Sequence, residues 1–179
     1  MFIWKYIDII NYELISEKVY NFIVNKTSIM QENATWNRLS KDEVLHDIPE
    51  LMTVFKNLGD LDPLNLSIVK CEPNQNIAVH IDSDTFARLL WPIKNCKGSY
   101  TKFFEIENAN IEKRYGVKKD LYYHINNIQD AKLLETVELT QPIVFKPWIP
   151  HGVWSNPDYS ESRLTLTIKF SKSLEYMLE

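Results

Sequence analysis

The first sixty residues repeat their apolar positions with the period of a helix. In residues 11–25, apolar side chains recur at steps of three and four, which predicts an amphipathic helix. Ser40 and Glu43 fit a capping box that opens a second, short helix. A third helix is expected to begin near Pro49 and to end at Gly59. The N-terminal third of the chain is therefore predicted to be mostly helical.

Beyond residue 63 the apolar pattern shortens to the period of a strand. Short runs rich in β-branched and aromatic residues are separated by Gly, Pro, Asn and Asp, and a further short strand is expected within residues 1–10. The runs are 66–72, 76–82, 88–93, 100–107, 143–145, 152–155 and 162–170. Many short strands in series, with no long helices between them, predict a β-sandwich or barrel.

Residues 108–140 interrupt this pattern because they are more polar and less periodic. We expect them to form a partly helical excursion between strands. The excursion either covers a site or is a solvated charged insert.

Length and composition are typical of one globular domain. The chain has 179 residues, of which 45% are hydrophobic and 25% charged, with a formal net charge of -4. This acidic balance gives no general attraction to phosphate backbones, so no nucleic-acid partner is expected. Cys71 and Cys96 show no metal or redox spacing and are predicted to be reduced structural thiols.

The N-terminus and the apolar runs bear on location. Lys5 and Asp8 interrupt the apolar start, and no apolar run approaches the length needed to span a membrane. We therefore expect a cytoplasmic protein without a signal peptide or a membrane partner. A monomer or a homodimer is the expected oligomeric state.

Candidate metal ligands lie in residues 76–82, where alternation places Asn76, Ala78, His80 and Asp82 on one face. A third candidate is His151, between a proline and a glycine at the head of an apolar strand. Two histidines and one carboxylate on a face, with the remaining positions open, are the ligation typical of non-haem Fe(II) oxygenases. The strands that carry these residues must then lie side by side.

An inward-facing arginine is predicted downstream of these ligands. Arg163, Thr165 and Thr167 share one face of a strand, whereas the other face is apolar. An arginine that faces the interior of a barrel is costly unless it meets an anion. Its planar fork suits a carboxylate, and the Thr165 hydroxyl can add another donor.

The order of His80-Ile81-Asp82, then His151, then Arg163-Leu164-Thr165 resembles the Fe(II)/2-oxoglutarate-dependent dioxygenase superfamily. Residues 88–95 and 99–101 resemble its small bacterial and phage members. The resemblance covers about residues 64–171.

The resemblance implies a mainly β (α+β) fold, a double-stranded β-helix or jelly roll, with N-terminal helices packed on the outside of one sheet. We expect a single domain, 1–179. Residues 1–62 would be helical support, and residues 63–171 the core with an insert at about 108–140.

By the same resemblance, His80, Asp82 and His151 are the Fe(II) ligands of the catalytic centre. Arg163, assisted by Thr165, would hold the distal carboxylate of 2-oxoglutarate. Such an enzyme consumes O2 and forms succinate and CO2. The expected reaction is hydroxylation of a small metabolite, an amino acid or a peptide side chain.

Two alternatives to this oxygenase stay open. A cupin-like metal enzyme that does not use 2-oxoglutarate would have no need for Arg163. A non-catalytic jelly-roll binding protein would have no need for intact metal ligands.

Four residues are candidates for contact with substrate: Arg88, Trp91, Trp148 and Trp154. Arg88 could meet a substrate anion, and a structural ion pair is the alternative. The tryptophans could wall the pocket or belong to the core. His46 and His124 lack ligand spacing and are predicted to be surface histidines.

Overall fold

The computed structural model describes residues 2–26, 35–83, 86–107, 111–115, 121–126, 128 and 131–179. The helices of these residues are α1 (Tyr12–Asn25), α3 (Lys41–Asp47), α4 (Glu50–Asn57) and the 3-10 helix η1 (Glu175–Leu178). The strands are β1 (Trp4–Tyr6), β2 (Trp36–Arg38), β3 (Pro63–Cys71), β4 (Asn76–Asp82), β5 (Arg88–Lys94), β6 (Tyr100–Glu105), β7 (Ile111–Tyr115), β8 (Leu121–Ile125), β9 (Lys132–Glu138), β10 (Ile143–Phe145), β11 (His151–Trp154) and β12 (Arg163–Phe170).

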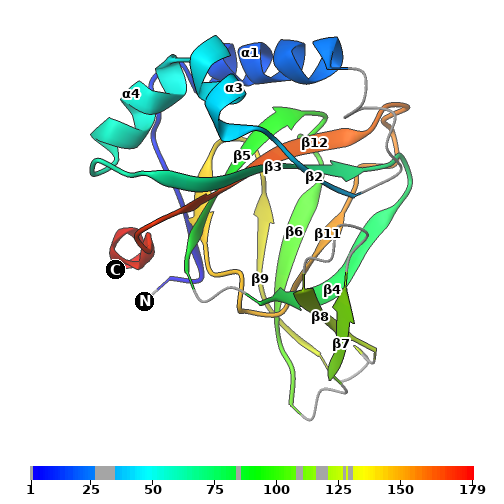
Figure 1. The fold of residues 1–179 in the computed structure, drawn as a ribbon. Coiled ribbons are helices and arrows are strands. Elements are labelled where there is room, and N and C mark those ends of the chain that lie inside the picture. Colours follow the sequence, from blue (N-terminus) through cyan, green and yellow to red (C-terminus); the bar gives the residue numbers. More distant parts are fainter. Residues whose placement is uncertain are drawn as a thin grey trace.

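The described strands form two six-stranded antiparallel sheets that face each other (Figure 1). Sheet A has the order β1-β10-β5-β12-β3-β2, and sheet B has the order β7-β8-β4-β11-β6-β9. Strands distant in sequence lie side by side in both sheets, as in β3 with β12 and in β4 with β11. The predicted jelly-roll fold is therefore confirmed.

The predicted helix signals act as expected at all three helices. α1 buries Ile15, Val19 and Ile23 on one side, which is the stripe that its apolar period defines. α3 begins after Ser40, whose hydroxyl accepts a hydrogen bond from the backbone N–H of Glu43. α4 begins directly after Pro49, and its C-cap Leu58 precedes Gly59, which has a φ of 123°.

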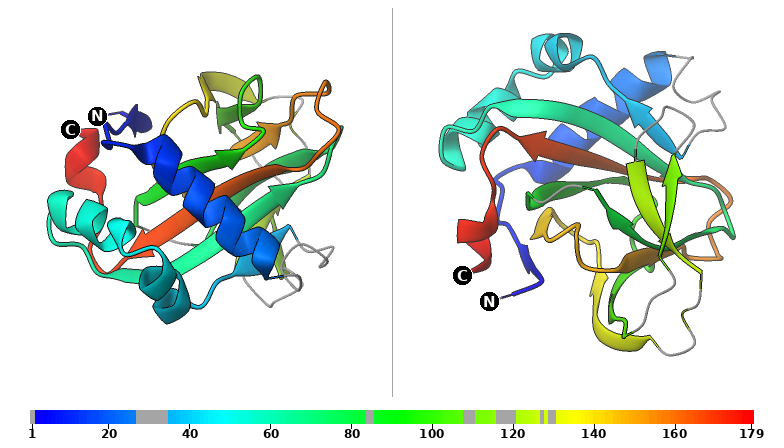
Figure 2. Two further views of the ribbon diagram at one scale, coloured as in Figure 1. Left: turned by 90° about the horizontal axis from the view of Figure 1, so that it is seen from above. Right: turned by 60° about the horizontal axis from the view of Figure 1, so that its bottom comes forward.

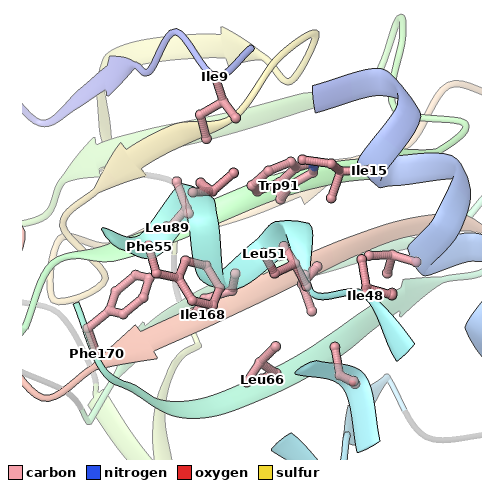
Figure 3. Close-up of a cluster of buried hydrophobic side chains, with 14 of the residues drawn as sticks. Ile9, Ile15, Ile48, Leu51, Phe55, Leu66, Leu89, Trp91, Ile168 and Phe170 are labelled. Atoms are coloured by element: carbon pink, nitrogen blue, oxygen red, sulfur yellow. The ribbon is translucent and has the colours of Figure 1, made fainter. Parts of the chain in front are cut away.

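The helices cover the outer face of sheet A, the face that points away from sheet B (Figure 2). Leu89, Trp91 and Ile168 of that face pack with Ile15 of α1 and Phe55 of α4 in one cluster (Figure 3). A buried hydrogen bond of 2.8 Å from Trp91 Nε1 to Ser16 Oγ ties this face to α1. The predicted packing of the N-terminal helices on the outside of one sheet is thus confirmed.

The inner face of sheet A meets sheet B in a second apolar cluster. Leu90, Ile143 and Phe145 of sheet A pack there with Phe103 of sheet B. Because both faces of sheet A are covered, its central strand β12 is buried at almost every residue. This inner space between the sheets also receives the candidate site.

The expected partly helical excursion is wrong where the structure describes it. β7 and β8 pair with each other and extend sheet B beside β4, and β9 forms the opposite edge. Charged residues on exposed positions of β7 and β9 hide the alternation in the sequence. The rest of the expected excursion, residues 108–110, 116–120, 127 and 129–130, lies outside the described residues.

Among the described residues, no helix has both the length and the apolar character that a membrane span requires.

Candidate metal centre

His80, Asp82 and His151 converge at one point of the inner space. His80 and Asp82 end β4, His151 begins β11, and His80 lies directly opposite His151 in the antiparallel pairing. One possible ligand atom from each of the three residues lies within 4.8 Å of the others. The side chains are buried, with residue exposures of 7%, 8% and 5%. The sequence prediction that these strands are neighbours is therefore correct.

The predicted common face of residues 76–82 is only partly observed. The pairing of β4 with β11 shifts register between His151 and Val153, so that Val153 lies opposite Ile77. Such an irregularity breaks the simple alternation of a strand. The backbone is tight there, because a Cβ added to Gly152 would lie 2.9 Å from the carbonyl oxygen of Ile77. His80 and Asp82, beyond the shift, keep their common direction.

The chain itself sets the tautomer of both imidazoles. Nδ1 of His80 lies 2.8 Å from the carbonyl oxygen of Ala78, and Nδ1 of His151 lies 2.8 Å from that of Ile149. A carbonyl can only accept, so each Nδ1 carries the proton and donates it. In the neutral form of each ring Nε2 then has a free lone pair, which is the form that a metal ligand needs.

Burial also favours the neutral form of His151. Burial first, and then the neighbouring His80, lower the pKa of His151 from 6.5 to about 4. His151 is therefore uncharged at neutral pH, and protons compete little with a metal for its imidazole. Two neutral imidazoles and one carboxylate are a donor set that suits Fe(II), and it also accepts other divalent metals.

The metal-free protein should lose stability in acid because of His151. Between pH 6.5 and about 4 the unfolded chain protonates this histidine, whereas the folded chain keeps it neutral. The free energy of unfolding should therefore fall as pH drops through this window, by at most about 3 kcal/mol. Urea unfolding in a chelator at several pH values would measure the fall. His151→Gln, which cannot titrate, should show a shallower dependence, and equal slopes in both proteins would contradict this account.

A second polar group of the inner space lies on sheet A. Arg163 is 3% exposed, and its Nε and Nη2 have no hydrogen-bond partner among the described residues. The same holds for the hydroxyls of Thr165 and Thr167 on β12 and of Thr101 on β6. Unpartnered buried donors are costly, so this set fits an anion that carries several acceptors. The inward direction predicted for Arg163 and Thr165 agrees with their pairing, since the intervening Leu164 packs in the outer cluster.

Arg88 forms an ion pair with a candidate metal ligand. Its Nη1 lies 2.9 Å from Oδ2 of Asp82, and the two side chains are 15% and 9% exposed. Of the two roles open to Arg88 from the sequence, the structure contains the ion pair. A substrate contact of Arg88 stays a prediction.

Two of the three tryptophans predicted to contact substrate point away from the site, and these predictions are wrong. Trp91 is fully buried on the outer face of sheet A against α1. Trp154 lies on the outer side of sheet B, where its ring contacts Phe104 and the ammonium of Lys102. Trp148 packs against the outer cluster of sheet A, and its role at the substrate site stays a prediction.

Sequence reasoning missed two residues of β8 that border the centre. Tyr122 lies opposite Asp82, and its ring is edge-on to that of His80 with the two ring centroids 6.1 Å apart. His124 lies opposite His80. His124 is half-buried rather than a surface residue, and burial, as the first cause, lowers its pKa. His46 is exposed on α3, as predicted. No sequence signal links β8 to β4, because their pairing is a tertiary contact.

Comparisons with known proteins find likeness in structure alone. No family model matches the chain, and no curated protein matches it in sequence. AviO1 from Streptomyces viridochromogenes Tue57 is 13% identical over 96% of this chain and 90% of its own, with a TM-score of 0.54. SnoK, a non-heme alpha ketoglutarate dependent carbocyclase from nogalamycin biosynthesis, is 10% identical over 94% and 80%, with a TM-score of 0.56.

The epimerase SnoN, solved with Fe3+, alpha ketoglutarate and nogalamycin RO, is 10% identical over 93% of this chain and 78% of its own, with a TM-score of 0.51. At such identities the likeness establishes the fold. The chain therefore has the fold of non-haem iron, 2-oxoglutarate-dependent oxygenases, as its resemblance to that superfamily predicted.

Proposed function

We propose that this protein is an Fe(II)- and 2-oxoglutarate-dependent oxygenase that hydroxylates a small metabolite, an amino acid or a peptide side chain. One observation carries the proposal: the inner space that holds the His80, Asp82 and His151 cluster also holds a buried Arg163 with unpartnered donors. A carboxylate that ends a metal-bound ligand would supply the acceptors that Arg163 lacks.

The proposed roles follow from the donor set. His80, Asp82 and His151 would hold the metal on one side and leave its other positions open. Arg163, with the hydroxyl of Thr165, would bind the distal carboxylate of 2-oxoglutarate. When bound, iron and 2-oxoglutarate supply the oxidising chemistry, in which O2 is consumed and succinate and CO2 are released. The protein contributes placement and exclusion of water.

The turn between β3 of sheet A and β4 of sheet B links the two halves of this proposed site. Arg163 lies opposite Cys71 at the end of β3, and β4 starts after a short turn and leads to His80. A cavity of about 220 Å³ opens at this turn and is lined by residues that include Cys71, Gln75 and Ala78. Its lining includes neither a candidate metal ligand nor Arg163, so this cavity is separate from the proposed site.

The alternative functions account for fewer of these features. A cupin-like metal enzyme that does not use 2-oxoglutarate leaves the buried guanidinium of Arg163 without an anion. A non-catalytic binding protein would have no need for two imidazoles whose Nδ1 hydrogen bonds leave Nε2 available to a metal.

A small substrate is proposed because of the charge of the chain and the residues near the centre. The net charge of -4 offers no general attraction to a phosphate backbone. Tyr122 and His124 border the metal centre with aromatic and hydrogen-bonding groups instead.

A cytoplasmic location and a monomeric or homodimeric state are further parts of this proposal.

Turnover of 2-oxoglutarate tests the proposed function. The Fe(II)-loaded protein should convert 2-oxoglutarate slowly to succinate without added substrate, and one class of small amino-acid-like compounds should accelerate this conversion. Protein loaded with Zn(II) is the matched control, since it keeps the ligation but not the redox chemistry. If the iron form neither binds nor consumes 2-oxoglutarate, the cupin-like alternative takes its place. Acceleration by single-stranded oligonucleotides that falls steeply with salt would contradict the substrate class.

A further inference from the structure

We propose that Arg88 is a positioning residue that keeps one oxygen of Asp82 away from the metal, so that this carboxylate takes a single coordination position. The proposal rests on the proposed function, because it concerns how many positions stay open for 2-oxoglutarate and O2.

The two carboxylate oxygens of Asp82 have different neighbours. Oδ2 accepts a hydrogen bond of 2.9 Å from Nη1 of Arg88, whereas Oδ1 lies 3.5 Å from Nε2 of His80. Nε2 is the nitrogen of His80 that its Nδ1 hydrogen bond leaves free for a metal. Oδ1 therefore lies on the ligand side of the carboxylate, and Oδ2 is held by the guanidinium.

The ion pair joins the two sheets at a well-packed place. Arg88 begins β5 of sheet A, and Asp82 ends β4 of sheet B. Phe145 lies opposite Arg88 in sheet A, and its ring centroid lies 5.4 Å from that of His151. The backbone N–H of Asp82 donates to the carbonyl oxygen of Pro147 at 3.0 Å. Both partners are thus fixed by backbone pairing, and a charge-assisted bond between them, largely out of water, is strong.

The ion pair has a direct consequence for ligation. A carboxylate with both oxygens free can bind a divalent metal through one or through two of them. If Asp82 bound the metal through both oxygens, beside the two histidines, fewer coordination positions would remain for O2 and for 2-oxoglutarate, which needs two of them. Arg88 also offsets the charge of Asp82, so that the metal keeps more of its charge for an anionic cosubstrate.

The test uses Co(II), whose visible absorption reports coordination number without any turnover. Arg88→Leu should change the Co(II) spectrum toward a higher coordination number, and its Co(II) form should bind 2-oxoglutarate about 10- to 100-fold more weakly than the wild type. Arg88→Lys keeps one charged donor and should restore both. Arg38→Leu is the matched control, since Arg38 is an exposed arginine of β2 whose side chain bonds Asn65.

Other outcomes would overturn the proposal. A Co(II) spectrum of Arg88→Leu identical to that of the wild type means that Arg88 does not limit Asp82. Loss of all Co(II) binding in a folded Arg88→Leu protein means that Arg88 is required for ligation itself. If Arg88→Leu fails to fold, the spectra of Arg88→Lys and Arg88→Gln decide, because Gln keeps a neutral donor and should give a spectrum between those expected for Lys and Leu. If the wild type binds Co(II) but not 2-oxoglutarate, the proposed function is refuted. The Co(II) spectra then still test whether Arg88 limits Asp82 to a single coordination position.

Discussion

Replacing His151 by alanine is expected to weaken binding of Mn(II) or Fe(II) by more than about 100-fold, since loss of a direct ligand should exceed the loss caused by a supporting residue. The variant removes one of three converging donors from a buried site. In the wild type, the imidazole of His151 donates through Nδ1, so its Nε2 is free for the metal to use. Calorimetry with Mn(II) under anaerobic conditions measures the affinity directly.

Thermal unfolding with and without metal separates this effect from a loss of fold. Metal at about 100 times the wild-type dissociation constant should stabilise the wild type by about 2.7 kcal/mol, and the same concentration should stabilise His151→Ala by less than about 0.4 kcal/mol. His46→Ala is the control, because it removes an exposed histidine of α3. Unchanged Mn(II) affinity in a folded His151→Ala protein would contradict the proposed metal centre.

Replacing Arg163 by leucine is expected to leave metal binding intact and to weaken 2-oxoglutarate binding by at least about 10-fold. The variant removes a charge-assisted pair, which typically contributes about 1.5–3 kcal/mol. Titration of the Mn(II)-loaded protein with 2-oxoglutarate measures the loss. Arg163→Lys should recover only part of the affinity, since lysine keeps the charge without the planar fork.

The stability of the ligand-free Arg163→Leu protein provides an independent check. Arg163 is buried, and two of its nitrogens have no partner among the described residues, so a shorter, apolar side chain removes a desolvation cost. The leucine variant should therefore unfold at an equal or higher urea concentration than the wild type. A variant that binds 2-oxoglutarate as tightly as the wild type would show that the anion site lies elsewhere.

Local patterns in the sequence were sufficient for most elements and for the choice of candidate metal ligands. The capping signal at Ser40, the apolar stripe of α1 and the runs that became β4 and β12 depend on neighbours a few residues apart. The shared direction of His80 and Asp82 follows from the strand period for the same reason. Alternation could also have corrected one error, since Trp154, three residues after His151, must face the other side of an unbroken strand.

The errors and omissions have a common physical origin in contacts between distant segments. Leu89, Leu90 and Trp91 are all buried because both faces of sheet A are covered, so apolar character could not tell which face meets the site. The short strands β7 and β8 form by pairing with each other, and β8 also pairs with β4. Their sequence periods are therefore weak.

The sequence by itself determined which residues are candidates to bind a metal and a carboxylate, because side-chain chemistry and strand alternation are local properties. Only the tertiary structure decided that His80 lies opposite both His151 and His124, and that Arg88 holds Asp82. Each of these pairs joins residues of different strands. Their proximity depends on sheet order, register and packing between sheets, which the packing of the whole chain determines.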